Sequence, residues 1–173
     1  MFLFCFVWFC HQGYAQPVVI DTTVSTDSRT RIAVPMFAVA DPQLEPIARE
    51  MTEVLSADLE FSGLFIVLPP SQYPAGFTGL TANAGALDLT AWLDARAENL
   101  VYGYVQSEGD MVVGQFRLFD LYSKTQLYGQ EVRVQRNYHR LAAHRFSEET
   151  IRLADGVAGI VRRLFAKKGA LHG

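Results

Sequence analysis

Cysteine is almost absent from this chain. The 173 residues include two cysteines, Cys5 and Cys10, and both lie in the first ten positions. The rest of the chain therefore has neither a disulfide nor a thiol nucleophile. A lipid-modified cysteine would need a small residue before it, whereas Phe4 and Phe9 precede these two, so we do not expect a lipoprotein.

Long runs of one charge are also lacking. Fifteen Lys and Arg residues against eighteen Asp and Glu residues give a net charge of -3, and neither sign forms a block. No basic surface is expected that could follow a phosphate backbone, which argues against a nucleic-acid partner. The sequence has no G-x-S-x-G turn, and its glycines match no phosphate-binding loop, so no small-molecule substrate is expected either.

The longest apolar run, residues 2–10, is too short to span a bilayer, which needs about 20 residues. Gly13 and Ala15 place small residues where a signal peptidase would require them. We therefore expect a signal peptide over residues 1–15 and export of the remainder. No Lys or Arg precedes Arg29, so the charged start of a signal peptide is missing and the natural start is expected upstream of Met1.

Half of the residues are apolar, which is enough for one compact domain, expected over residues 16–160. Residues 17–26 are rich in β-branched side chains and are typical of a strand. A second strand is expected over residues 31–39. Pro35 within it favours an edge position or a bulge.

A helix is predicted from Asp41 onward, where the apolar residues change to three- and four-residue spacing. Asp41 can cap this helix, Pro42 suits its first turn, Phe61 would complete its apolar stripe and Gly63 would end it. Residues 64–68 then form a short apolar run, typical of a buried strand. The stripe is made by Leu44, Ile47, Ala48, Met51, Val54, Leu55 and Leu59.

Residues 69–88 contain three prolines, three glycines and no sustained period. A loop of this length is either a functional contact surface or a solvated connection, and both interpretations stand at this stage. A helix that begins at Asp88 or Thr90 follows. Trp92 on that helix is expected in the core, together with Phe116 and Phe119 further along the chain.

A three-stranded meander is predicted next, with strands over residues 100–105, 111–121 and 126–135. A last helix should begin near Asn137 and end before Gly156. The order β-α-β-α-β-β-β-α predicts an α/β fold in which helices pack on a mixed sheet.

Two groups of polar residues are candidates for reactive sites. His144 and Glu148 stand four apart on the last helix and share a face, but a metal site needs three or four ligands, so we expect a solvated helix face there. Asp94 and Glu98 stand four apart on the preceding helix, and they too are expected to face solvent rather than to catalyse. Neither a metal nor a cofactor is predicted.

The segments resemble, in their order and spacing, the amino-terminal domain of the TolB family. The similarity runs from about residue 17 to residue 160. It is carried by Val19-Ile20-Asp21, Ile32-Ala33-Val34-Pro35 with Phe37, Ala57-Asp58-Leu59-Glu60, Ser62-Gly63-Leu64-Phe65, Trp92, Gly103, Gly109-Asp110, Arg117-Leu118-Phe119-Asp120 and Ala143-His144-Arg145-Phe146.

This resemblance implies an anticodon-binding-domain-like α/β fold without catalytic activity, in the periplasm. In the family, the segment after the signal peptide contacts the inner-membrane-anchored protein TolA. The residues themselves independently suggest that this strand could add to the sheet edge of another protein, although pairing within its own sheet is the alternative. The implied contact residues are Pro17, Val18, Val19, Ile20, Asp21 and Thr22.

The resemblance ends after Ile160. Family members continue there into a β-propeller that contacts the lipoprotein Pal, whereas residues 161–173 form a divergent basic tail. This difference suggests a truncated or frame-shifted product and puts the Pal contact in doubt.

The leading hypothesis is therefore an adaptor domain of the Tol-Pal system, which maintains the cell envelope and acts in cell division. A structural or regulatory subunit of an outer-membrane secretion or cell-wall machine is the alternative. A small hydrolase that uses His144 and Glu148 is a third hypothesis.

Overall fold

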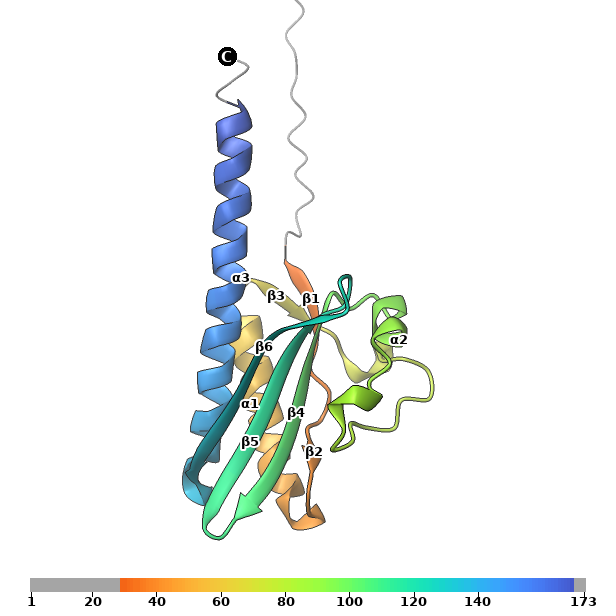
Figure 1. The fold of residues 1–173 in the computed structure, drawn as a ribbon, viewed down its shortest axis with the longest axis vertical. Coiled ribbons are helices and arrows are strands. Elements are labelled where there is room, and N and C mark those ends of the chain that lie inside the picture. The colour runs from red at the N-terminus through yellow and green to blue at the C-terminus, as the bar shows by residue number, and fades with distance from the viewer. Residues whose placement is uncertain (1–28, 170–173) are drawn as a thin grey trace, which may run out of the picture.

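The computed structural model describes residues 29–169, with side chains to residue 156. It contains a six-stranded sheet and three α-helices, which confirms the predicted α/β fold (Figure 1). The helices are α1 (Glu45–Phe61), α2 (Leu89–Asp94) and α3 (His139–Gly169). The strands are β1 (Thr30–Ala33), β2 (Ala38–Val39), β3 (Phe65–Val67), β4 (Asn99–Glu108), β5 (Met111–Asp120) and β6 (Thr125–Gln135).

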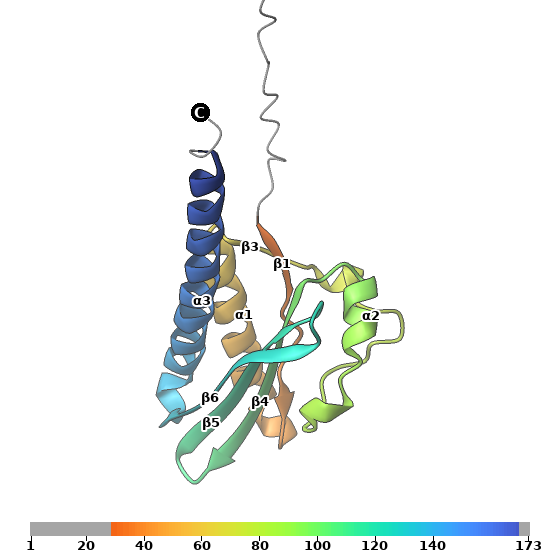
Figure 2. The ribbon, with the colours of Figure 1, turned by 45° about the horizontal axis from the view of Figure 1, so that its top comes forward.

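The sheet is mixed, with the order β3-β1-β4-β5-β6 and with β2 also paired to β4. β1 is parallel to both of its neighbours, while β4, β5 and β6 form the predicted antiparallel meander. Helices α1 and α3 lie to one side of the sheet and α2 lies on the other, as Figures 1 and 2 show. Residues 17–26, predicted as a strand, lie outside the described residues.

Pro35 interrupts what would otherwise be one strand along β4. The chain takes five steps from Ala33 to Ala38 where β4 takes four from Leu100 to Tyr104, so one extra residue is accommodated between β1 and β2. Proline has no N–H to offer to a ladder, which explains why the break occurs here. The strand predicted over residues 31–39 is thus divided into β1 and β2, and β1 is an internal strand and not an edge.

Helix α1 ends as the sequence predicts but begins later, because a 3₁₀ turn over Pro42–Leu44 precedes it and Asp41 caps that turn. The Asp41 carboxylate accepts a hydrogen bond from the Gln43 N–H at 2.8 Å, and Gly63 follows the helix with a φ of 70°. Phe61, expected in the apolar stripe, is instead 95% exposed. It follows the buried Leu59 by two positions, which places it about 200° around the helix from the core.

Helix α3 packs beside α1 through Ala142, Ala143 and Phe146, all fully buried. Its predicted end before Gly156 is wrong, because the helix continues to Gly169. A single glycine costs a helix only about 1 kcal/mol relative to alanine and is tolerated without a cap or a proline beside it. Residues 161–169, where the family would have a strand, are helical, and α3 extends well past the sheet (Figure 1).

Two apolar clusters cover the two faces of the sheet. Along β4, Val101 and Val105 belong to the larger cluster under α1 and α3, whereas Leu100 belongs to the smaller cluster with Trp92. Phe116 joins the larger cluster, while Phe119 packs against the smaller one and is partly exposed. All three aromatic residues assigned to the core therefore pack as predicted.

Gly103 in β4 allows the ring of Phe37 to lie directly on the backbone. A β-carbon at this position would come within 2.3 Å of Phe37 Cδ1, and Phe37 is itself held by an edge-to-face contact with Phe116 at 5.4 Å. The Phe37 ring is 2% exposed and packs in the larger cluster, so it has no free space to enter. Glycine is therefore required at residue 103 for packing.

We expect Gly103→Ala to lower the free energy of unfolding by about 3 kcal/mol or more, because Phe37 and its neighbours must move. Urea denaturation followed by tryptophan fluorescence would measure the change. Gly156→Ala is the matched control: nothing lies within 4 Å of the added carbon, so this helix substitution should stabilise by about 0.5–1 kcal/mol. A small effect at Gly103 would contradict the described packing.

Candidate protein-interaction surfaces

The predicted contact residues Pro17, Val18, Val19, Ile20, Asp21 and Thr22 lie outside the described part of the chain. What the structure does show is the strand into which they lead. Thr30 begins β1, and its N–H donates to the Leu64 carbonyl at 2.9 Å. The described chain therefore begins at an internal strand, whose first residue lies at the end of the sheet past which α3 extends (Figure 2).

The loop of residues 69–88 is ordered by an aromatic cluster. The rings of Tyr73 and Phe77 each lie 4.9 Å from the Trp92 ring in edge-to-face geometry, and 5.8 Å from one another. Such pairs add about 0.5–1.5 kcal/mol beyond their buried area. The loop is therefore packed onto α2. The interpretation of this segment as a merely solvated connection is not supported.

Hydrogen bonds attach the same loop to the sheet. The Tyr73 hydroxyl donates to the Val34 carbonyl at 3.1 Å, and the Tyr102 hydroxyl donates to the Thr81 carbonyl at 2.9 Å. Burial raises the pKa of both phenols above the usual range, with the guanidinium of Arg117 partly opposing the effect at Tyr102. Both hydroxyls therefore stay protonated as donors well beyond neutral pH.

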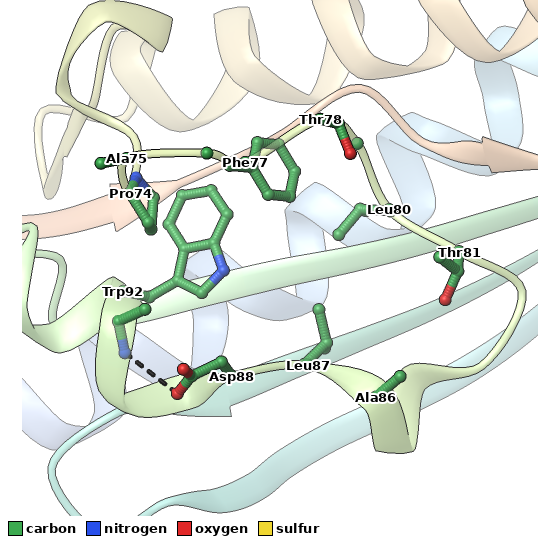
Figure 3. A pocket seen from close by; sticks show the side chains of 13 residues that line it. Pro74, Ala75, Phe77, Thr78, Leu80, Thr81, Ala86, Leu87, Asp88 and Trp92 are labelled. Atoms are coloured by element: carbon green, nitrogen blue, oxygen red, sulfur yellow. Dashed lines mark hydrogen bonds between the residues drawn. The ribbon is translucent and has the colours of Figure 1, made fainter.

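A small pocket lies between the two halves of this loop (Figure 3). Its volume is about 300 Å³, at the lower end for ligand sites. Asp88 is its one charged lining residue, and that carboxylate already caps α2 by accepting from the N–H groups of Thr90 and Ala91. The one carboxylate is thus engaged at the start of the helix, and the remaining walls of the pocket are uncharged. Its walls are residues 74–81, 86–88, 91 and 92.

The histidines of α3 bind carboxylates on α1 and not Glu148. His144 Nδ1 lies 2.7 Å from Asp58 Oδ2, and His139 Nε2 lies 2.8 Å from Glu50 Oε2. The expected solvated face is present at Glu148, which is exposed, whereas His144 is half-buried against α1. Within residues 29–169 no three metal-ligating side chains come together, so the hydrolase hypothesis gains no site from this face.

Asp58 serves a second group as well. The buried hydroxyl of Ser147 has one proton and two acceptors within reach, Asp58 Oδ2 at 2.5 Å and the His144 carbonyl at 2.8 Å. In the sequence, Asp58 stands out only as part of the family resemblance. Its role depends on two helices that run side by side and parallel, and no local pattern reveals that arrangement.

The other candidate carboxylates have structural roles. Helix α2 ends at Asp94, so Glu98 lies beyond it and the two are not on one helix face. Glu98 Oε2 instead accepts from the Arg31 N–H at 3.3 Å. Asp120 accepts from the N–H groups of Tyr122 and Ser123 and so shapes the turn between β5 and β6.

No helix in the described part of the chain combines the length and the apolar character that a bilayer span requires.

Comparison with known proteins gives consistent matches. A family model described as the TolB amino-terminal domain matches residues 18–127. Tol-Pal system protein TolB of Syntrophotalea carbinolica is 34% identical over 133 residues, which cover 71% of this chain and 30% of that protein. Tol-Pal system protein TolB of Dinoroseobacter shibae is 35% identical over 118 residues, which cover 67% of this chain and 26% of that protein.

Among solved structures, the crystal structure of TolB from Acinetobacter baumannii matches with a TM-score of 0.50 at 23% identity. The match covers 70% of this chain and 27% of that one, and at this identity it shows the fold alone. The chain spans less than a third of the length of each of these relatives.

We expect Asp58→Ala to destabilise the fold by about 1–2 kcal/mol, because Ser147 and His144 lose their shared carboxylate and the serine hydroxyl keeps only the His144 carbonyl as an acceptor. Glu50→Ala is the matched control, since Glu50 is about half exposed and its loss should cost under about 1 kcal/mol. Chemical denaturation of both variants would measure the difference. Equal losses would contradict a special role for Asp58.

The raised phenol pKa values predict a loss of stability in alkali. The folded state holds these protons more tightly than the unfolded state does, so the stabilisation is present below about pH 10, the ordinary phenol pKa, and is lost as pH rises through the folded values. The double substitution Tyr73→Phe and Tyr102→Phe should flatten the fall in unfolding free energy that sets in near pH 10, about the ordinary phenol pKa, and continues above it. An unchanged slope in that variant would refute the assignment.

Proposed function

Because this chain belongs to the TolB amino-terminal domain family, we propose that it is a non-enzymatic adaptor of the Tol-Pal system that works in the periplasm. The observation that carries the proposal is the family match over residues 18–127. The described surfaces support it, because they offer packing and hydrogen-bonding groups without a catalytic constellation. Export would follow from the apolar segment at residues 1–15.

We propose further that residues 17–22 bind a TolA-like inner-membrane protein. The family match begins at residue 18, so it includes nearly all of this segment. Val18, Val19 and Ile20 are β-branched and suit an extended conformation. Backbone hydrogen bonds to a sheet edge of the partner would supply affinity, and alternate side chains would supply specificity.

The arrangement of the sheet supports this assignment, because the described sheet does not use the residues that are proposed to bind. β1 is bonded on one side to β3 and on the other to β4, and it begins at Thr30, next to the start of the described chain. A partner can therefore engage the preceding residues without removing any strand from the described sheet. Pal is left out of the proposal, because residues 29–169 form no propeller blade.

We expect deletion of residues 16–26 to abolish binding to the periplasmic part of TolA from the same organism. Binding of the intact chain should have a dissociation constant of about 1 µM, a value suited to so short an element. Isothermal titration calorimetry would measure both. The deletion should leave the thermal unfolding midpoint unchanged, and undiminished binding would refute the proposed contact.

A free peptide of residues 17–26 provides a second test. It should compete with the intact chain for TolA, whereas a peptide with the same residues in scrambled order should not, because the alternation of side chains is lost. Equal competition by both peptides would argue against strand addition as the mechanism.

A further inference from the structure

Strand β6 forms one edge of the sheet. Among the described strands it bonds to β5 alone, and at eleven residues it is long for an edge (Figure 1). An edge strand presents a row of unpaired N–H and C=O groups that can template the addition of another strand. Natural sheets usually shorten, cover or interrupt such an edge, and the register of β6 with β5 shifts at Leu127. The stretch from Tyr128 to Gln135 is regular and still long enough to pair.

The alternation of hydrogen bonds identifies the residues at this open edge. Gly109-Asp110 is a two-residue turn, so the residues on either side of it, Glu108 and Met111, form a hydrogen-bonded pair. The backbone N–H and C=O groups of the odd-numbered residues of β5 therefore point toward β4. Even-numbered residues of β5 then bond even-numbered residues of β6. The Arg136 N–H, which donates to the Asp110 carbonyl at 3.1 Å, agrees with this alternation. The backbone N–H and C=O groups that point away from β5, into the open edge, belong to Gly129, Glu131, Arg133 and Gln135.

The two faces of β6 differ in polarity. Val132 and Val134 are buried on the face toward the larger apolar cluster, whereas Glu131 and Arg133 are exposed on the opposite face. The Arg133 guanidinium lies 3.1 Å from Glu131 Oε1 and 3.0 Å from Glu108 Oε2. Opposite charges two residues apart on an edge strand are self-complementary when two copies of the strand run antiparallel.

We propose that a second copy of this chain pairs antiparallel with β6, about a two-fold axis at Val132. This register places Glu131 opposite Arg133 of the second copy, and by symmetry the pair occurs twice. Gly129 then lies opposite Gln135 of the second copy. The apolar faces of both strands remain on the same side of the joined sheet, so the pairing exposes no buried residue.

Charge selects this register from its neighbours. An axis at Glu131 would place two carboxylates directly opposite one another. An axis at Gln130 would place Glu131 opposite Gly129 of the second copy, so the carboxylate would face no charge across the new strand pair. Arginine carries five N–H donors, so Arg133 can keep Glu108 while it binds the second copy's carboxylate.

Analytical ultracentrifugation of the exported chain should show a monomer–dimer equilibrium with a dissociation constant of about 10 µM. Glu131→Arg and Arg133→Glu, each alone, place two like charges in opposition and should weaken the dimer about tenfold or more. An equimolar mixture of the two variants should restore association between unlike chains. In that mixed dimer the introduced arginine faces the introduced glutamate, and the native Arg133 of the first variant faces the native Glu131 of the second.

The controls are charge reversals on the exposed surface of α1, Arg49→Glu and Glu53→Arg, which should leave the dimer unchanged. Thermal unfolding of every variant checks that the fold survives. A chain that stays monomeric to about 100 µM, or a dimer that survives both single reversals, overturns the proposal. Failure of the mixture to associate overturns the register. None of these results depends on TolA binding.

Discussion

The fold depends on β4, which is bonded along both of its edges and covered on both of its faces. β1, β2 and β5 all pair with it, and its side chains alternate between two separate apolar clusters. Such a strand has no solvent face, which explains its nearly continuous apolar sequence. It also explains Gly103, because the aromatic ring that covers that face lies on the backbone itself.

Much of this fold could be predicted from the sequence, because its signals are local. Asp41 marks the 3₁₀ turn that leads into α1, Gly63 marks the end of that helix, Gly109-Asp110 marks the tight turn, and the family resemblance is confirmed. The errors arise where a local pattern has more than one outcome. Propensity alone ends α3 at Gly156, although one glycine does not stop a helix. Phe61 lies about 200° from Leu59, and the partner of His144 is Asp58 on another helix.

The candidate surfaces could be predicted less well, because they depend on how distant segments meet. The composition of residues 69–88 indicates a contact surface or a connection, but the attachment of this loop through Tyr73, Phe77 and Trp92 needs the position of α2. The open edge of β6 needs the strand order of the whole sheet. Together these features separate the domain into an end where the chain enters, a face with a small pocket and an edge available for pairing.

The position of β1 has a mechanical consequence. A force applied to the residues before Thr30 enters the sheet along the axis of β1, which is parallel to β3 on one side and to β4 on the other. Such a load acts on the hydrogen bonds of both neighbours in shear and distributes itself among them, instead of opening them one at a time from an end. A partner that pulls on the N-terminal segment would thus meet the domain in the direction in which its sheet resists extension best.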